Sequence, residues 1–250
     1  MPPSDVVPRI ALIGAMQEEL SAVLALMQDA SCETVAGRQF WQGHLNGHAV
    51  VAVLSGIGKV AAAITATLLI EKFQVQRILF TGVAGGLAPH AKVGDVVVGS
   101  ELLQHDMDAS PLFPRYEVPL LNRSRFQTDA VMTRCLIESA GLALPQARVL
   151  AGLIISGDQF VSSAAESRRL QFEIPDALAV EMEGAALAQV CFAYDIPLAV
   201  VRTLSDRADD EAHTNFTQFV KEVASQYSAA IVAEFLKRLT STNRDDGNTT

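Results

Sequence analysis

Short aliphatic runs alternate along this chain with longer segments of helical character, and this alternation most constrains the fold. Such runs are expected to be strands of a parallel sheet, because those strands are covered on both faces. The expected strands are 9–15, 78–81, 95–103, 149–156, 179–182 and 198–203, and the expected helices are 17–29, 59–73, 127–140 and 214–239. Asn46-Gly47 predicts a hairpin between 39–45 and 48–55. This order predicts an α/β fold with a largely parallel sheet and an added hairpin.

A single domain from residue 9 to residue 240 is the simplest organisation, because no internal repeat or low-complexity linker divides the chain. Half of the residues (50%) are apolar, which is enough for one large core. Residues 1–8 are expected to be an N-terminal extension and residues 241–250 a disordered tail. Residues 104–125 hold three prolines without a clear period. They predict a long loop of the kind that is either functional or disordered.

The net charge of −9 limits the partners of this chain. Nucleic acid requires a basic face, and anionic lipids would be repelled, so we expect a small neutral or zwitterionic ligand, no nucleic acid and no membrane. The cysteines, at 32, 135 and 191, form no zinc-binding motif, and free thiols are typical of a reducing compartment. Residues 1–9 lack a signal-like apolar core, and the apolar stretch 60–70 is too short for a bilayer. The expected location is therefore the cytoplasm.

Two glycine-rich segments resemble nucleotide-binding loops without matching them. In 55–59, Val53 and Val60 stand where a phosphate-binding loop requires Gly and Ser or Thr. Segment 82–86 lacks the spacing of a dinucleotide-binding turn. It indicates a close backbone approach, either for packing or for a ligand.

Carboxylates stand where several expected strands end, and ligands of open α/β sheets bind beyond those ends. Glu18 and Glu19 follow the first strand. Glu181 and Glu183 flank Met182 inside an aliphatic run, where a charge must be paired or functional. A lone acid is more often part of a solvated surface, but this joint placement favours a site.

Six segments in this order resemble the methylthioadenosine/S-adenosylhomocysteine nucleosidases. They are 13–19, 55–62, 81–87, 156–160, 180–186 and 201–206. The resemblance extends from residue 10 to residue 239, and it implies a three-layer α/β/α single domain around a twisted mixed sheet. It also implies hydrolysis of the N-glycosidic bond of 5′-methylthioadenosine and S-adenosylhomocysteine in methionine salvage. A homodimer is expected on the same ground, and no cofactor and no metal are expected.

The resemblance also assigns roles in the reaction. Asp206, held by Ser205, is expected to protonate the departing base, which requires burial to raise its pKa. Glu19 is expected to activate the attacking water, and Glu183 to bind the ribose hydroxyls. Arg202 is expected to orient the water and the carboxylates, with a structural ion pair as the alternative.

The base-binding residues follow from the same resemblance. Phe160 is expected to stack on adenine, unless it is an ordinary core aromatic, and the backbone of Val161 to read the edge of the base. Phe216 is expected to line the pocket of the 5′-substituent, part of which comes from the neighbouring subunit in that family. The remaining expected substrate-binding residues are Ala84, Gly85, Glu181 and Met182.

Two departures from the family pattern concern the substrate. Val83 stands where many members have a small hydroxyl residue, so one polar contact is expected to be absent. The loop 108–119 also differs, which leaves the preferred 5′-group open. His105, Asp106 and Asp108 could suggest a metal site, but no further His or Cys follows closely.

Three alternatives remain at this point. A purine nucleoside phosphorylase of the same fold would need cations for phosphate, but the first strand is followed by acids, with only Arg38 between Arg9 and Lys59. An aminofutalosine nucleosidase would share every catalytic residue and differ in the 5′-pocket. A non-catalytic nucleoside-binding protein is disfavoured by the presence of Glu19 and Asp206.

Overall fold

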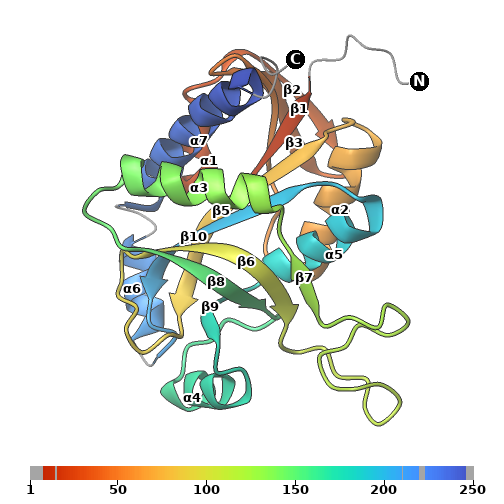
Figure 1. Cartoon of the computed structure of the whole chain (residues 1–250), viewed down its shortest axis with the longest axis vertical. Coiled ribbons are helices and arrows are strands. Elements are labelled where there is room, and N and C mark those ends of the chain that lie inside the picture. The colour runs from red at the N-terminus through yellow and green to blue at the C-terminus, as the bar shows by residue number, and fades with distance from the viewer. Residues whose placement is uncertain (1–7, 15, 210, 220–222, 246–250) are drawn as a thin grey trace.

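The strands of this protein form one ten-stranded mixed sheet with helices on both faces (Figure 1). The computed structural model describes residues 8–245 except 15, 210 and 220–222. The strands are β1 (Arg9–Gly14), β2 (Gln28–Val35), β3 (Arg38–Leu45), β4 (His48–Leu54), β5 (Arg77–Gly86), β6 (Val96–Gln104), β7 (Arg125–Gln127), β8 (Val149–Ser156), β9 (Ala177–Glu181) and β10 (Leu198–Asp206). The helices are α1 (Gln17–Leu24), α2 (Lys59–Glu71), α3 (Ala130–Ala143), α4 (Ala164–Glu173), α5 (Gly184–Tyr194), α6 (Ala212–Phe219) and α7 (Ser225–Asp245).

The sheet has a parallel centre and a closed end. Strands β4, β1, β5 and β10 are parallel neighbours, and β2 and β3 extend the β4 edge as an antiparallel meander. At the other end, β5, β9, β8, β6 and β10 pair in a closed ring, because β10 pairs with both β6 and β5. The carboxyl ends of β5, β9 and β10 therefore meet at one point.

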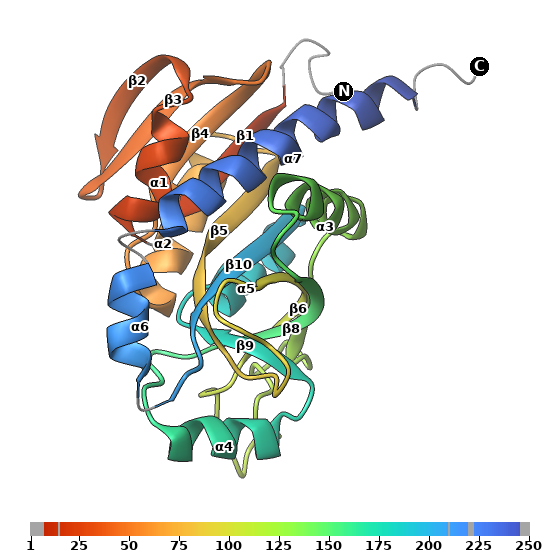
Figure 2. The same cartoon turned by 90° about the vertical axis from the view of Figure 1, so that its left-hand side faces the viewer.

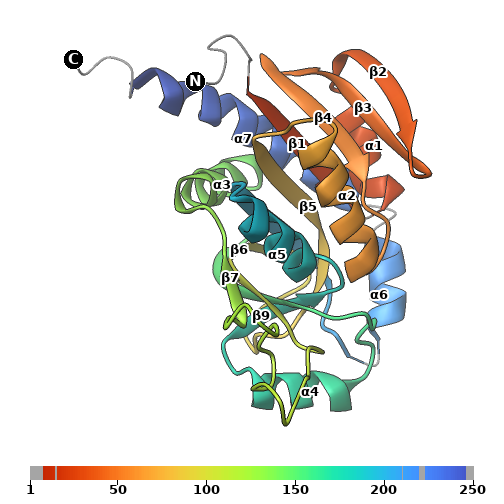
Figure 3. The same ribbon diagram turned by 90° about the vertical axis from the view of Figure 1, so that its right-hand side faces the viewer.

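Two helical layers cover the sheet, which confirms the predicted three-layer α/β/α fold. Helices α2 and α5 lie side by side on one face (Figure 3), where Leu69 and Leu187 join Phe40 and Phe80 in one apolar cluster. Helices α1, α3 and α7 cover the other face (Figure 2), with Phe235 in the second cluster. Helix α4 lies apart, beside the ring.

The predicted hairpin at Asn46-Gly47 is confirmed as the β3–β4 turn. Both residues have a positive φ, 48° and 82°, as a tight primed turn between twisted strands requires. The loop 104–125 is also confirmed in outline. All of its residues are described, and between β6 and β7 they contain only an isolated bridge, Val118 to Arg123.

Several predicted boundaries are wrong. The helix expected over 17–29 ends at Leu24, because the chain turns there into β2, an exposed polar edge strand without an aliphatic run. The strand expected over 78–81 continues to Gly86, and that expected over 198–203 continues to Asp206. Residues 214–239 were expected to form one helix, whereas α6 and α7 are two helices with different axes (Figure 2).

The ends of the chain are only partly described. Of the predicted N-terminal extension, residues 1–7 lie outside the described residues, as do 246–250 of the predicted tail, whereas α7 extends to Asp245. No helix within the described part of the chain is both long and apolar enough to cross a membrane.

Candidate active site

A cavity of about 390 Å³ lies where the carboxyl ends of β5, β9 and β10 meet. The structure brings nine of the twelve predicted site residues into its wall: Ala84, Gly85, Phe160, Glu181, Met182, Glu183, Ser205, Asp206 and Phe216. The exceptions are Val161, Arg202 and Glu19. The described wall residues include carboxylates, aromatic rings and one histidine, but no Arg or Lys.

Asp206 occupies the last position of β10 and is almost completely buried, with 1% of its surface exposed. Its two carboxylate oxygens accept hydrogen bonds from the Ser205 hydroxyl and from the amide of Ala208, both at 2.8 Å. Burial raises the pKa of Asp206, and these two hydrogen bonds offset the rise only in part. The geometry matches an acid that retains its proton at higher pH than an ordinary aspartate.

A bulge and a glycine create the space for this carboxylate. The register of β10 against β5 shifts between Leu204 and Asp206, which pair with Ala84 and Gly85. Bulges of this kind re-aim a side chain next to a site. A Cβ on Gly85 would lie 2.9 Å from Asp206 Oδ1, so only glycine allows the carboxylate this position. Packing against Asp206 and Ala208, one of the two alternatives for segment 82–86, therefore accounts for Gly85.

Glu181 lines the cavity, but protein groups occupy its carboxylate. Arg202 Nη2 donates to it at 2.8 Å in a pair that is buried on both sides. The amides of Glu183 and Gly184 donate to it at 2.9–3.2 Å, and the Ser156 hydroxyl is a further donor. These contacts hold the turn that joins β9 to α5. Glu181 therefore shapes the site through its neighbours.

The described contacts of Arg202 are those of a structural ion pair, the alternative to a role in orienting water. Besides Glu181, its guanidinium donates to the carbonyl of Val201 at 3.0 Å and to that of Phe80 at 3.5 Å, and it lies 3.8 Å from the centre of the Phe80 ring. It is not among the described residues of the cavity wall. Its water-orienting role stays a prediction.

Glu183 is the second acid of the cavity wall, and it precedes the first residue of α5. The residue is 5% exposed, and its Oε1 accepts a hydrogen bond of 2.8 Å from the amide of Gly58. Gly58 has a φ of 94°. The β4–α2 turn thus contacts the acid expected to bind ribose, although 125 positions separate the two residues.

Apolar and aromatic side chains form the remaining wall. Phe160 is 39% exposed, and its ring meets that of Phe216 edge-on with centres 5.5 Å apart. Val83 and Met16 pack with Phe216 in one apolar cluster. Val161 is buried in another cluster and is not among the described wall residues. An exposed phenylalanine beside a cavity is typical of a stacking surface rather than a core residue.

Sequence reasoning missed four wall residues, Met16, Ile57, Val180 and His213. His213 lies three positions before Phe216 in α6, and this spacing places both on one helix face, which could have indicated it. Conversely, Glu19 lies in α1, but its side chain is not among those described. Its predicted role remains a prediction.

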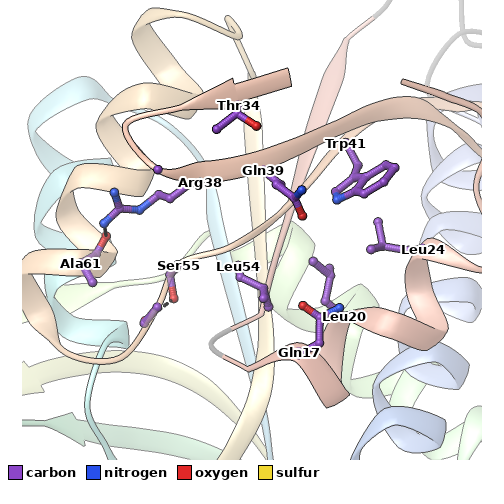
Figure 4. Close-up of a pocket in the computed structure, with 12 residues that line it drawn as sticks. Gln17, Leu20, Leu24, Thr34, Arg38, Gln39, Trp41, Leu54, Ser55 and Ala61 are labelled. Carbon is purple, nitrogen blue, oxygen red and sulfur yellow. Dashed lines mark hydrogen bonds between the residues drawn. The ribbon is translucent and has the colours of Figure 1, made fainter. Parts of the chain in front are cut away.

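A larger cavity, of about 640 Å³, lies between α1, the β2–β3 hairpin and the start of α2 (Figure 4). Its described wall includes Arg38, Trp41 and Gln39 but none of the predicted site residues. Ser55 and Gly56 line it, whereas Ile57 lines the smaller cavity. The β4–α2 turn therefore separates the two spaces, and size alone does not identify the site.

The histidine and aspartates after β6 do not assemble a metal site. Within the described part of the chain, no three side chains of His, Cys, Asp or Glu are grouped as metal ligands. Asp106 binds Lys59 instead, and Asp108 binds Ser110. Burial lowers the pKa of His105.

The fold is that of an α/β protein with a closed mixed sheet and a cavity at its strand ends, and comparison with known proteins identifies its family. The profile of the phosphorylase superfamily matches residues 9–237. A 5′-methylthioadenosine/S-adenosylhomocysteine nucleosidase of Bacillus thuringiensis is 38% identical over 232 residues, covering 92% of this chain and 99% of that protein. This chain therefore belongs to the phosphorylase superfamily and, within it, to the 5′-methylthioadenosine/S-adenosylhomocysteine nucleosidase family.

Solved structures show the same relationship. The nucleosidase of this name from Neisseria meningitidis, in complex with methylthio-immucillin-A, is 36% identical with a TM-score of 0.87, covering 92% of this chain and 99% of that one. The futalosine hydrolase of Helicobacter pylori is 35% identical with a TM-score of 0.86, covering 93% and 98%.

Proposed function

We propose that this protein hydrolyses the N-glycosidic bond of 5′-methylthioadenosine and S-adenosylhomocysteine, releasing adenine and the thioribose. The observation that carries the proposal is the buried Asp206 in the wall of a cavity that also holds Glu183 and Phe160. Cleavage of this bond places negative charge on the base and positive charge on the sugar. An acid, a carboxylate and an aromatic platform are the groups that this charge separation needs.

The residues act as follows in this proposal. Adenine stacks on Phe160, and Asp206, whose pKa burial raises, donates a proton to the departing base. Glu183 binds the ribose hydroxyls and stabilises the cationic sugar. Glu19 activates the water from α1, which begins three residues after β1 ends. Val83 and Phe216 supply an apolar wall that suits a thioether at the 5′ position.

Water, rather than phosphate, is the proposed nucleophile. A phosphorylase requires cationic side chains or helix amides around its phosphate. The described cavity wall has three acids, Glu181, Glu183 and Asp206, and no Arg or Lys. A wall without such cations offers phosphate no partner and favours a neutral nucleophile.

Adenine release from methylthioadenosine, measured with and without phosphate, tests the proposal. We expect release that does not depend on phosphate and yields free methylthioribose, and almost none from Asp206→Asn. Release only with phosphate would identify a phosphorylase. Binding of the nucleoside without release in either condition would identify a binding protein.

A nucleosidase for aminofutalosine is the second candidate, because the futalosine hydrolase of Helicobacter pylori is nearly as similar to this chain as the nucleosidases are. The same adenine-release assay with aminofutalosine separates the two. A kcat/KM for aminofutalosine well above that for methylthioadenosine would reassign the substrate.

We further propose a cytoplasmic homodimer that acts in methionine salvage. Val60 and Ile64 on α2 and Phe192 on α5 are exposed apolar side chains. The two helices lie side by side (Figure 3), an arrangement that suits a symmetric interface. All three cysteines are free thiols, as a reducing compartment favours. Light scattering after size exclusion should give twice the mass of 26.7 kDa.

A further inference from the structure

Three polar side chains, those of Lys59, Asp106 and Asp158, join three loops beside the candidate active site. Lys59 begins α2, Asp106 follows β6, and Asp158 follows β8. None of the three is among the described residues of the cavity wall. We call this cluster the loop clamp.

The salt bridge of the loop clamp is well formed. Lys59 Nζ lies 2.6 Å from Asp106 Oδ1 and donates also to Gln104 Oε1 at 3.1 Å, and the lysine side chain is only 16% exposed. Burial alone would raise the pKa of Asp106. The hydrogen bonds from Lys59 and from the amide of Asp158, together with the lysine charge, outweigh it and hold that pKa below its usual value. Asp106 is therefore an anion with two donors.

Asp158 connects this salt bridge to the β4–α2 turn. Its amide donates to Asp106 Oδ2 at 2.9 Å, and its own Oδ1 accepts the amide of Lys59 at 2.7 Å. The preceding amide, that of Gly58, donates to Glu183 Oε1 at 2.8 Å. A Cβ on Gly58 would lie 3.0 Å from Asp158 Oδ1, so the two loops are in close contact. The position of the Gly58 amide, and with it the Glu183 carboxylate, thus depends on the loop clamp.

The same clamp reaches the aromatic platform. Asp158 lies two positions before Phe160, in the loop that joins β8 to α4. That ring is partly exposed and contacts Phe216 only by its edge. The hydrogen bonds of Asp158 therefore anchor the loop from which Phe160 projects into the cavity wall.

We propose that Lys59, Asp106 and Asp158 are positioning residues, which fix the Gly58 amide against Glu183 and so orient the group that binds ribose. This inference rests on the proposed nucleosidase function, and the clamp itself touches no substrate. An ordinary exposed salt bridge would contribute little to stability and nothing to catalysis. A substitution in a positioning cluster should therefore lower the rate of catalysis, whereas one in an ordinary salt bridge should not.

The test compares two substrates in Asp106→Ala and Lys59→Met. For methylthioadenosine, we expect kcat/KM to fall by about 10- to 100-fold, because a misplaced catalytic group is costly while the fold is kept. The 2′,3′-dideoxy analogue offers no ribose hydroxyl to Glu183. With it, the variants should lose at most about threefold relative to wild type, in kcat/KM or in the inhibition constant if turnover is slow, and that small loss is the part that the Phe160 loop accounts for.

Two further variants complete the design. Lys72→Met is the matched control, since it breaks a lysine–carboxylate pair with Glu33 at the other end of α2 and should leave both substrates unaffected. Asp106→Asn keeps one of the two acceptor oxygens, for either the Asp158 amide or the Lys59 ammonium, and should give a smaller loss than Asp106→Ala. This conservative variant also reports if the alanine variant fails to fold.

The outcomes separate the clamp from the proposed function. A wild-type protein that does not release adenine from methylthioadenosine overturns the function and the ribose role together. An active wild type with unaffected clamp variants overturns the clamp alone. Equal losses on both substrates would show a general effect of folding or packing and would also overturn it.

Discussion

Replacing Arg202 with methionine tests how the candidate site is held together. In Arg202→Met, Glu181 loses its 2.8 Å ion pair but keeps donors from Ser156, Glu183 and Gly184. Breaking a buried pair costs about 3–5 kcal/mol, and these donors place the expected cost at the lower end, about 3 kcal/mol. For a chain of this size, the expected fall in Tm is about 6–12 °C.

The opposite substitution, Glu181→Gln, is expected to be worse. The buried guanidinium of Arg202 would lose its counter-charge and keep only neutral acceptors, the amide oxygen of the new glutamine and the carbonyls of Val201 and Phe80. Among the described residues, its Nε already has no hydrogen-bond partner. A buried cation without its counter-charge places the expected loss in the free energy of unfolding at the upper end of that range, about 5 kcal/mol. The Tm should then fall by about 10–20 °C.

Urea and thermal unfolding at one fixed protein concentration measure both variants. The double variant Arg202→Met/Glu181→Gln should recover part of the lost stability, because it removes both charges together. The reasoning would be refuted if the free energies of unfolding of the single variants lay within about 1 kcal/mol of wild type. It would also be refuted if Arg202→Met were more destabilising than Glu181→Gln. Adenine release by the folded double variant also tests the predicted water-orienting role of Arg202, since that role would leave the variant slow.

Four other outcomes are expected. Asp206→Asn should lower kcat by at least about 100-fold while nucleoside binding, measured by calorimetry, persists. The pKa of Asp206 is raised in the folded state, so its contribution to stability is present at low pH and is lost as pH rises through that pKa. In urea titrations, the free energy of unfolding of Asp206→Asn should therefore depend less on pH than that of wild type. An unchanged pH dependence would contradict the assignment. In Gly85→Ala, the new Cβ would lie 3.0 Å from that of Ala208 and closer still to Asp206. This variant should lose most of its turnover while its Tm changes little. Wild-type kinetics would show that the position of the carboxylate is not critical. In thiol titration, exposed Cys32 should react in the native protein, whereas Cys191, whose pKa burial raises to about 12, should react only after unfolding.

The sequence predicted the fold where burial leaves a pattern. Strands β1, β8 and the core of β5 are aliphatic runs because both of their faces are covered. Strand β2 escaped prediction because it is an exposed edge with the polar sequence QDASCETV. Helix α4 has a polar composition and buries only Ser167 and Leu170, so no apolar stripe indicated it.

The closure of the sheet could not be predicted from local patterns. It depends on β10 pairing with both β5 and β6, which are contacts between distant segments. The resemblance to a known family supplied the site residues, and nine of the twelve do line one cavity. It assigned Glu183 to the ribose and counted Glu181 among the substrate-binding residues, but it did not show that protein groups occupy the Glu181 carboxylate.

Those partners also explain how one cavity can hold acids in different states. Arg202 pairs with Glu181, so the cation compensates a carboxylate that holds the β9–α5 turn. The hydrogen-bond partners described for Asp206 are neutral, a hydroxyl and an amide, and its burial therefore favours the protonated form. When two neighbouring acids have different surroundings, one can keep its proton while the other stays an anion, and this difference sets their roles in a site. Arg202 pairs with Glu181 and is not among the described wall residues, so it does not stabilise an anionic Asp206, which can therefore protonate a departing base. For the same reason, the described wall lacks the cation that phosphate would require.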